Sequence, residues 1–143
     1  MSPITVTRSI FIARPPEAVW DFTQDYTKRP LWDSSVRDTK ELQADPRIVR
    51  VYGPIVCADF VYKQNDRPHK TSLAMENIES RLIEGGGGSW QYTARGNGTL
   101  WTQTNTIVLR NTLMAKLLRP VLAMGMRYST KQAMKKAGRL IEQ

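Results

Sequence analysis

The stretch "GGGGSWQYTARGNGTLW", residues 85–101, contains glycines that can be interpreted in three ways, and each interpretation implies a different fold. They could cradle a phosphate, link two domains, or bend a strand within a wall. A phosphate loop follows a strand, opens a helix and usually carries a lysine, whereas residues 89–95 read as a strand and no lysine follows. A linker is a poor fit because strands lie on both sides. We therefore expect a bend or bulge in a long strand, closed by a tight hairpin at Gly96-Asn97-Gly98.

The segment after this hairpin, residues 99–109, alternates with the two-residue period of a strand. Thr102, Thr104 and Thr106 form its β-branched outer face. The opposite face points inward and consists of Trp101, Gln103, Asn105, Ile107 and Leu109. Two amides on an inward face must find hydrogen-bond partners or cost a few kcal/mol. They mark this strand as a candidate wall of a ligand site.

Further strands precede the glycines. Residues 47–52 and 54–63 are predicted to form a hairpin about Gly53. Alternation in the second of these strands and in the next one predicts an inward set of Ala58, Phe60, Tyr62, Thr71, Leu73 and Met75. The N-terminus adds a strand over residues 4–12, a helix started by "RPPEAVWDF", and a second short helical segment over residues 26–32. The expected order is one strand, two short helices, six strands and one long helix.

The long helix is predicted over residues 111–143, where good helix formers dominate. Pro120 marks either a kink or the first turn of its main part. One face of this helix collects Leu118, Leu122, Gly125, Met126, Ser129, Ala133, Ala137 and Leu140. Its small residues suit a close approach to a sheet. Lys136 falls within this face, so either the face rotates there or the side chain extends outward along its stem.

Charge is concentrated in the same helix. The chain of 143 residues has a net charge of +8, and residues 110–143 carry eight basic side chains against Glu142 alone. A solvated face is the default interpretation of the opposite, basic side, formed by Arg127, Lys131, Lys135 and Arg139. An acidic carrier protein or an anionic membrane surface are possible partners. Nucleic acid is disfavoured because no nucleic-acid-binding module signature occurs.

Length and composition predict one domain over residues 1–143. No apolar run is long enough for a membrane span and no signal peptide is evident, so we expect a cytoplasmic protein. A single cysteine, Cys57, and a single histidine, His69, predict no metal site, and we expect no cofactor. The sequence leaves the oligomeric state open.

The N-terminal stretch "ITVTRSIFIARPPEAVWDFTQDYTKRPLWDSSV", residues 4–36, resembles the opening of the START-like superfamily. The nearest group is the bacterial polyketide cyclase/dehydrase and lipid-transport group, often called SRPBCC. Matching positions are Ala13, Pro15, Glu17, Val19, Trp20, Asp25, Trp32 and Asp33. "NGTLW" at residues 97–101 is similar to the start of that family's final strand, although Asn97 replaces a frequent glycine.

This resemblance implies an α+β helix-grip fold. In that fold a curved seven-stranded antiparallel sheet, with two short helices, wraps a long C-terminal helix and encloses a cavity. Our expected elements agree with it. The motifs are structural and fix no chemistry, because a shared fold does not by itself carry a function.

The predicted ligand site combines inward aromatics with a few neutral polar groups, the usual composition of a concave binding site. We expect it to be lined by Trp32, Phe60, Tyr62, Met75, Trp90, Tyr92, Trp101, Gln103, Asn105, Leu118, Leu122 and Met126. Any one of these aromatics could equally be plain core. The predicted function is binding of a hydrophobic or aromatic small molecule, such as a lipid or a polyketide.

The alternative function, suggested by the resemblance, is a polyketide cyclase, aromatase or dehydratase. Gln103, Asn105 and Tyr62 are weak candidates for catalytic groups, because they could hydrogen-bond an enolate oxygen. The inward set contains almost no ionisable group and no obvious base. His69 follows a turn and Arg8 lies on the first strand, and a rim or surface position suits both. Whether the protein is an enzyme stays open.

Overall fold

The computed structural model describes residues 2–143, and these form one seven-stranded sheet and three helices. In chain order they are β1 (Ile4–Ile12), α1 (Pro16–Thr23), α2 (Arg29–Trp32), β2 (Asp38–Ala44), β3 (Arg47–Tyr52), β4 (Cys57–Asp66), β5 (Lys70–Glu79), β6 (Ile83–Arg95), β7 (Gly98–Leu109) and α3 (Leu113–Glu142). The predicted order of elements is confirmed.

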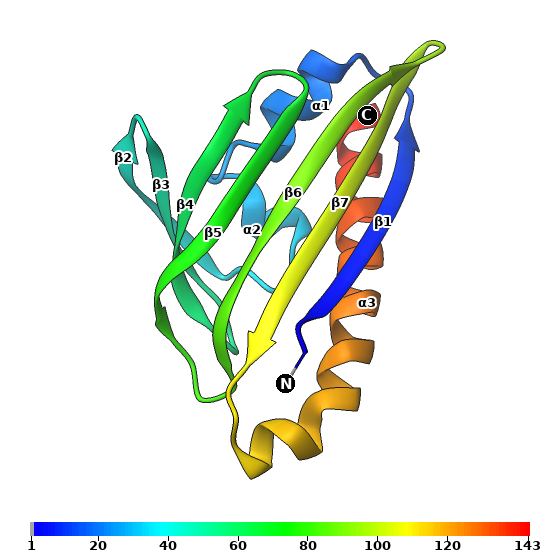
Figure 1. Cartoon of the computed structure of the whole chain (residues 1–143). Helices are drawn as coiled ribbons and strands as arrows, with labels where there is room; N and C mark the ends of the chain where they lie inside the picture. Colours follow the sequence, from blue (N-terminus) through cyan, green and yellow to red (C-terminus); the bar gives the residue numbers. More distant parts are fainter. Residues whose placement is uncertain (1) are drawn as a thin grey trace.

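The sheet is antiparallel throughout, with the strand order β1-β7-β6-β5-β4-β3-β2. Its first and last strands in the sequence, β1 and β7, therefore pair side by side. The helices lie on one face of this sheet, with α3 running along β1 (Figure 1). This is the expected helix-grip fold.

The glycine run lies inside the long strand β6, as expected. The pairing of β6 with β7 shifts by one residue between Ile83 and Gly85, so a bulge precedes the run. Arg95 pairs with Gly98 across a two-residue turn, in which Gly96 has a φ of +56°. A positive φ at the first turn position favours glycine and is typical of tight hairpins. The hairpin prediction is confirmed.

Strand β4 starts at Cys57 rather than at residue 54 as predicted. Residues 54–56 form a loop instead, because the Gly53 N–H closes a turn by bonding the Val56 carbonyl at 3.0 Å. Pro54 also has no N–H to give to a sheet. This loop borders a cavity.

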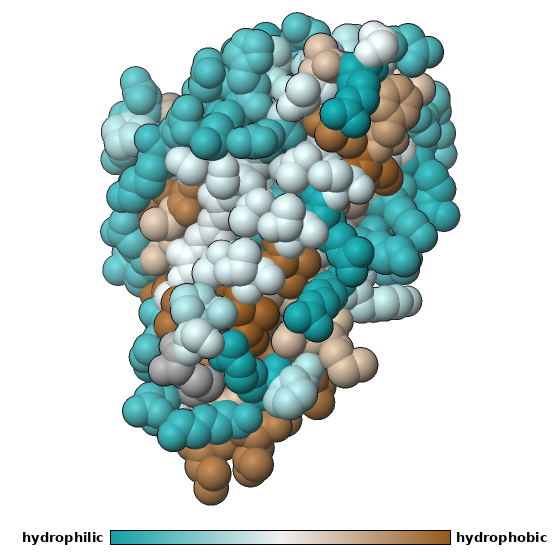
Figure 2. Space-filling view, turned by 45° about the vertical axis from the view of Figure 1, so that its right-hand side comes forward, coloured by the Kyte–Doolittle hydropathy of each residue, from teal (hydrophilic) through white to brown (hydrophobic). Residues whose placement is uncertain are grey.

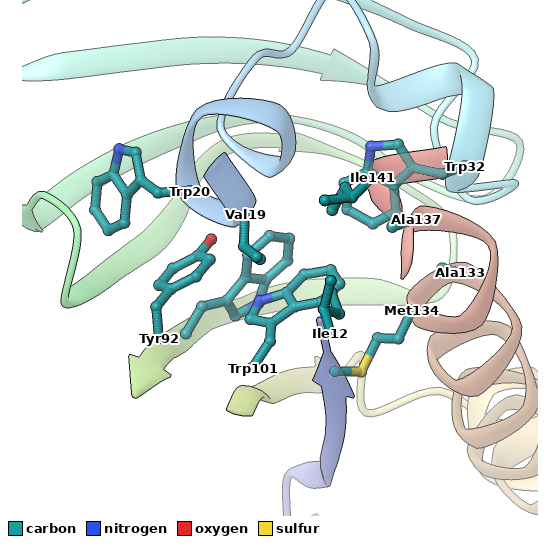
Figure 3. Packing of buried hydrophobic residues seen from close by; sticks show 11 residues of the cluster. Ile12, Val19, Trp20, Trp32, Tyr92, Trp101, Ala133, Met134, Ala137 and Ile141 are labelled. Carbon is teal, nitrogen blue, oxygen red and sulfur yellow. The ribbon is translucent and has the colours of Figure 1, made fainter. Parts of the chain in front are cut away.

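The largest core cluster fills the space between the helices and the end of the sheet that holds the β6–β7 hairpin. Trp101 is fully buried at its centre, against Val19 of α1 and Ile12 of β1 (Figure 3). Helix α3 closes the cluster with its last turns. Its contributing side chains are Ala133, Met134, Ala137 and Ile141.

Helix α3 is bent rather than straight (Figure 1). It begins at Leu113, with the Thr112 hydroxyl accepting from the Ala115 N–H at 3.2 Å, and Pro120 lies within it. Proline kinks a helix because it removes one backbone hydrogen bond, and α3 bends near its N-terminal end (Figure 1). Of the two interpretations of Pro120, the structure supports the kink. Lys136 is exposed, so its side chain extends outward.

The expected close approach of α3 at Gly125 is wrong. A Cβ built on Gly125 would meet no atom within 4 Å, whereas one on Gly138 would contact Ile10 and Ile12 at 3.6 Å. The helix therefore lies against β1 near its C-terminal end and stands away from the sheet at Gly125. The gap between them is a cavity.

Candidate ligand-binding cavity

A cavity of about 450 Å³ lies between α3 and the inner face of the sheet. Strands β3 to β7 supply one wall, and α3 supplies the other through Leu122, Met126 and Ala133. Most lining atoms are apolar. The exposed lining residues mark the mouth, and they are Ser35, Pro54, Ile55, Val121 and Gly125. The mouth thus opens between the β3–β4 loop and the first half of α3.

Eight of the twelve residues predicted to line a ligand site do line this cavity. They are Phe60, Tyr62, Met75, Trp90, Gln103, Asn105, Leu122 and Met126. They come from β4, β5, β6, β7 and α3. The side chains predicted from the two-residue period of the strands and from the helical period therefore face the same cavity. Gly87 and Gly88 of the glycine run also line it. A wall without side chains leaves room there for a ligand.

The other four predicted lining residues lie elsewhere. Trp32, Tyr92 and Trp101 are 0 to 2% exposed and pack in the core cluster beside the cavity rather than on its surface (Figure 3). Helix α1 covers that end of the sheet by packing on β6 and β7. Leu118 is 36% exposed and does not line the cavity, because it lies before the Pro120 bend.

The two inward amides form a chain with a defined direction. The Trp90 indole N–H donates to Asn105 Oδ1 at 2.9 Å, and Asn105 Nδ2 donates to Gln103 Oε1 at 2.8 Å. An indole nitrogen can only donate, so the orientation of both amides follows from it. Gln103 is 3% exposed, and its Nε2 has no acceptor among residues 2–143. The cavity therefore holds one amide donor that lacks a protein partner.

A buried ion pair that the sequence did not predict also lines the cavity, from helix α2. Arg29 Nε donates to Asp33 Oδ2 at 2.8 Å, and both side chains are buried and line the cavity. The guanidinium carbon of Arg29 lies 4.8 Å from the ring centroid of Trp32 and 4.8 Å from that of Trp90. Such stacking orients a planar cation.

This pair corrects the expectation that the inward set has almost no ionisable group. Asp33 also accepts from the Ser35 backbone N–H at 3.0 Å and from its hydroxyl at 2.6 Å, so the carboxylate is well satisfied. By contrast, the two terminal amino groups of Arg29 donate to no acceptor within residues 2–143. The only sequence signal was local: Tyr26 and Trp32 lie three residues before and after Arg29, at helical spacing.

A row of hydroxyl groups adjoins this end of the cavity. Tyr26 and Tyr62 share a hydrogen bond of 2.7 Å between their hydroxyls, and Tyr62 donates to Gln24 Oε1 at 2.8 Å. Gln24 Nε2 in turn donates to the Tyr92 hydroxyl at 2.8 Å, which also bonds Thr23 at 2.7 Å. Gln24, Tyr26 and Tyr62 line the cavity. Tyr92 was predicted as a lining residue, but it does not line the cavity and instead supports this row through its hydrogen bonds to Gln24 and Thr23.

The protonation states follow from burial and charge. Burial, with help from the neighbouring Tyr26, raises the pKa of Tyr62 well above its usual range, and burial also raises the pKa of Tyr92. Both phenols therefore stay neutral near pH 7. Burial alone would lower the pKa of Arg29, but the Asp33 carboxylate, together with Tyr26 and Tyr62, outweighs this effect and the net pKa is raised. The cavity thus presents a permanent cation and neutral hydroxyls.

The remaining polar candidates lie outside the cavity. Arg8 and His69 are exposed, and Cys57 is a half-buried thiol at the start of β4. None of the three is a lining residue. Among residues 2–143, no three His, Cys, Asp or Glu side chains gather where they could hold a metal ion. Chemistry in the cavity rests on Arg29, Asp33, the amides and the phenols.

Comparison with known families identifies the chain. A family model described as polyketide cyclase / dehydrase and lipid transport matches residues 3–140. The chain belongs to this family. The START-like, SRPBCC resemblance expected from residues 4–36 is thereby confirmed. The comparison with curated proteins returns no match.

Solved structures share the fold at low sequence identity. The Zhui aromatase/cyclase from Streptomyces sp. R1128 has a TM-score of 0.82 at 12% identity, covering 99% of this chain and 94% of its own. The protein TTHA0849 from Thermus thermophilus has a TM-score of 0.80 at 17% identity and covers 96% of each chain. A START superfamily protein from Mycobacterium smegmatis has a TM-score of 0.65 at 12% identity, covering 91% of this chain and 97% of its own. At these identities the likeness shows the fold alone.

No helix in residues 2–143 has the length and apolar content that a membrane crossing requires.

Proposed function

We propose that the cavity binds a hydrophobic or aromatic small molecule, lipid-like or polyketide-like, that carries an oxygen acceptor or an anionic group at one end. The observation that carries this proposal is the pair of unsatisfied donors in an otherwise apolar cavity. Gln103 Nε2 is a buried donor with no acceptor within residues 2–143, and the terminal amino groups of Arg29, which are not fully buried, form no hydrogen bond there. Burying a donor without an acceptor costs about 1 to 3 kcal/mol, which a ligand oxygen would recover.

The two donors serve one end of the cavity. Trp90 is the cross-strand neighbour of Gln103 and also stacks under the Arg29 guanidinium. The donors therefore flank the same indole ring. Elsewhere the lining is apolar, with Met75, Leu122 and Met126, which all pack against one core cluster. We infer that the ligand lies with its polar end at Trp90 and its apolar end against these three side chains.

Two probe molecules of matched shape test this orientation. We expect 2-naphthoic acid to bind at least about tenfold more tightly than 2-methylnaphthalene, because a charge-assisted hydrogen bond contributes about 1.5 to 3 kcal/mol. Binding can be measured by quenching of tryptophan fluorescence, since Trp90 lines the cavity, and by calorimetry.

The matched variant is Gln103→Glu. It keeps the oxygen that accepts from Asn105 and replaces the unpaired donor by a second oxygen. This variant should lose the preference for the acid. Gln91→Glu makes the same change at an exposed position on β6 and should keep it. Equal affinities of the two probes, or a preference unchanged in Gln103→Glu, would contradict the proposal.

The second candidate function is a cyclase or aromatase that acts on a bound polyketide. It is favoured by the presence of Asp33, Arg29 and the Tyr26–Tyr62 hydroxyl pair in the cavity wall, and by membership of the family. Structural neighbours include proteins named as aromatase/cyclases. Arg29 and Gln103 could hold an enolate oxygen, which stabilises the charge that develops when a carbon between two carbonyls loses its proton.

Turnover separates the two functions. A cyclase should convert a poly-β-ketone thioester into a cyclised product with a pattern that differs from spontaneous cyclisation, read by liquid chromatography and mass spectrometry. Tyr62→Phe removes one hydroxyl and should slow the reaction, while Gln103→Glu should reduce it strongly. A product pattern that is identical with and without the protein leaves binding as the function.

A further inference from the structure

The first half of α3 presents an apolar face to solvent. Leu113, Leu117, Val121, Met124 and Tyr128 are 64 to 73% exposed. At about 100° per residue these five side chains fall within a sector of about 80° on the helix. We call them the apolar face of α3. Hydrophobic residues gather at the lower end of the molecule, where Figure 1 places the start of this helix (Figure 2). A contiguous exposed patch of this kind marks an interaction surface.

The same sector of the helix becomes basic further along. Lys131, Lys135 and Arg139 continue the line of the apolar face toward the C-terminus at the same helical angles. None of the three forms an ion pair within residues 2–143. Helix α3 has no acidic residue before Glu142. The outward side of α3 is thus an apolar segment followed by an unneutralised cationic one.

The apolar face is continuous with the mouth of the cavity. Val121 belongs to both, since it is 64% exposed and also lines the cavity. Across the mouth, Ile55 in the β3–β4 loop is 50% exposed and lines the cavity too. A surface that covered the apolar face would therefore also cover the entrance to the cavity.

We propose that this side of α3 docks on an anionic lipid bilayer, with the apolar face inserted among the lipids and Lys131, Lys135 and Arg139 against the headgroups. Interfacial helices bind in this way, by burying apolar area and attracting anionic lipids. Each basic side chain near such a surface adds to the attraction. Arg119 is not included among the side chains that contact headgroups, because its guanidinium donates a hydrogen bond to the Ser2 carbonyl at 2.8 Å.

A second copy of this chain is a poorer occupant. Packing two α3 helices in parallel sets the basic segments against each other, and packing them antiparallel sets each basic segment against an apolar one. Neither arrangement neutralises the charge. A bilayer with anionic headgroups meets both the apolar and the cationic requirement.

Docking would place the cavity mouth at the bilayer, so that a hydrophobic ligand could pass between the lipids and the cavity without crossing water. This consequence rests on the proposed function, whereas docking itself does not. The experiment therefore uses lipid vesicles without any added ligand, and its failure is distinguishable from a failure of ligand binding.

The full chain is sedimented with vesicles of phosphatidylcholine alone and with vesicles that also contain phosphatidylglycerol. We expect binding to the anionic vesicles only, weakening as salt rises. Lys131→Glu with Lys135→Glu should weaken it by roughly thirtyfold or more. Leu117→Ser with Met124→Ser should weaken it by at least about tenfold, because two exposed apolar side chains are lost.

Matched controls lie elsewhere on the surface. Lys40→Glu with Arg95→Glu makes the same charge change at exposed positions on β2 and β6, and Leu31→Ser with Leu42→Ser removes two exposed leucines. Both double variants should bind anionic vesicles more tightly than the corresponding α3 variants. The proposal is overturned by an absence of vesicle binding, by equal binding to neutral vesicles, or by equal loss in the controls. It is also overturned if sedimentation velocity shows a dimer that Leu117→Ser with Met124→Ser dissociates.

Discussion

Asn105 forms hydrogen bonds to two neighbouring side chains, so we expect it to contribute measurably to the free energy of unfolding. Its Oδ1 accepts from the Trp90 indole and its Nδ2 donates to Gln103. Asn105→Leu would leave the Trp90 indole N–H without its acceptor, at a cost of about 1 to 3 kcal/mol. Urea denaturation measures this loss. Thr104→Val, on the outer face of the same strand, removes one exposed hydroxyl pair with Thr7 and should cost less than about 0.5 kcal/mol. Equal losses in both variants would contradict this role of Asn105.

The buried phenols predict how stability depends on pH. The pKa of Tyr92 and that of Tyr62 are raised in the folded protein, whereas a phenol in the unfolded chain ionises near about pH 10. Above that pH the unfolded state releases protons that the folded state keeps. The stability contributed by these groups is therefore complete below about pH 10 and is lost as pH rises toward the folded pKa values.

Tyr92→Phe isolates one of these groups. Its unfolding free energy should fall less steeply between about pH 9 and about pH 11 than that of the unsubstituted protein, by up to about 1.4 kcal/mol per pH unit. The two proteins differ only at Tyr92, so the contributions of all other groups cancel in the comparison. Urea denaturation across this range gives the two slopes, and parallel slopes would show that Tyr92 is not protected from ionisation.

Individual site residues could be predicted only where a strand or helix was long enough for the period of its sequence to show which side chains point inward. Gln103 and Asn105 were predicted to point inward because β7 alternates cleanly. Arg29 was missed because α2 has four residues, too few for a helical period, and an arginine beside Lys28 looks like a surface residue. Its burial depends on Asp33 and on the indole of Trp90, which is distant in the sequence.

Within strand β6, neighbouring glycines should differ sharply in tolerance. A Cβ on Gly87 would lie 2.5 Å from the Leu73 carbonyl oxygen, which is backbone and cannot move aside. A Cβ on Gly85 would lie 3.4 Å from Val108, an ordinary contact. Gly87→Ala should therefore destabilise the protein by about 1 to 3 kcal/mol, and Gly85→Ala by clearly less. Thermal or urea denaturation decides this, and similar losses would mean that the run is only a slack segment.

One glycine of helix α3, Gly125, is not required by the packing around it. Gly125 has open space where a Cβ would lie. Gly125→Ala should raise the free energy of unfolding by about 0.5 to 1 kcal/mol, because alanine loses less backbone entropy in a helix. Urea denaturation measures this gain. A destabilised Gly125→Ala would show that the helix lies closer to the sheet than described.

The elements with strong periods were predicted well, and the errors lie where a local bend interrupts a period. The helical face drawn through Leu118 and Leu122 used a constant angle of about 100° per residue, yet Pro120 lies between them and bends the helix. The strand drawn from residue 54 ignored the turn that Gly53 makes with Val56. Each of these interruptions contains a proline, Pro120 in the helix and Pro54 after Gly53. The sequence shows where these prolines are, but the backbone geometry at each depends on the residues around it.

Across the whole molecule, the sequence could predict the fold and the existence of an apolar site more completely than the boundary between cavity and core. Eight of twelve predicted lining residues line the cavity, but Trp32, Tyr92 and Trp101 do not. Alternation tells which face of a strand points inward, and all inward aromatics look alike in that respect. Which of them are covered depends on where α1 and the last turns of α3 pack, and this is a long-range property.

Native mass spectrometry can test directly whether the cavity binds a hydrophobic small molecule. The protein is purified from its own source cells for this measurement. The comparison protein is Gly125→Phe, whose new ring would occupy the mouth of the 450 Å³ cavity from a position with open space. We expect a bound small molecule on the unsubstituted protein, released on denaturation, and none on folded Gly125→Phe. An unsubstituted protein that carries no molecule and takes up no 2-naphthoic acid would contradict this expectation.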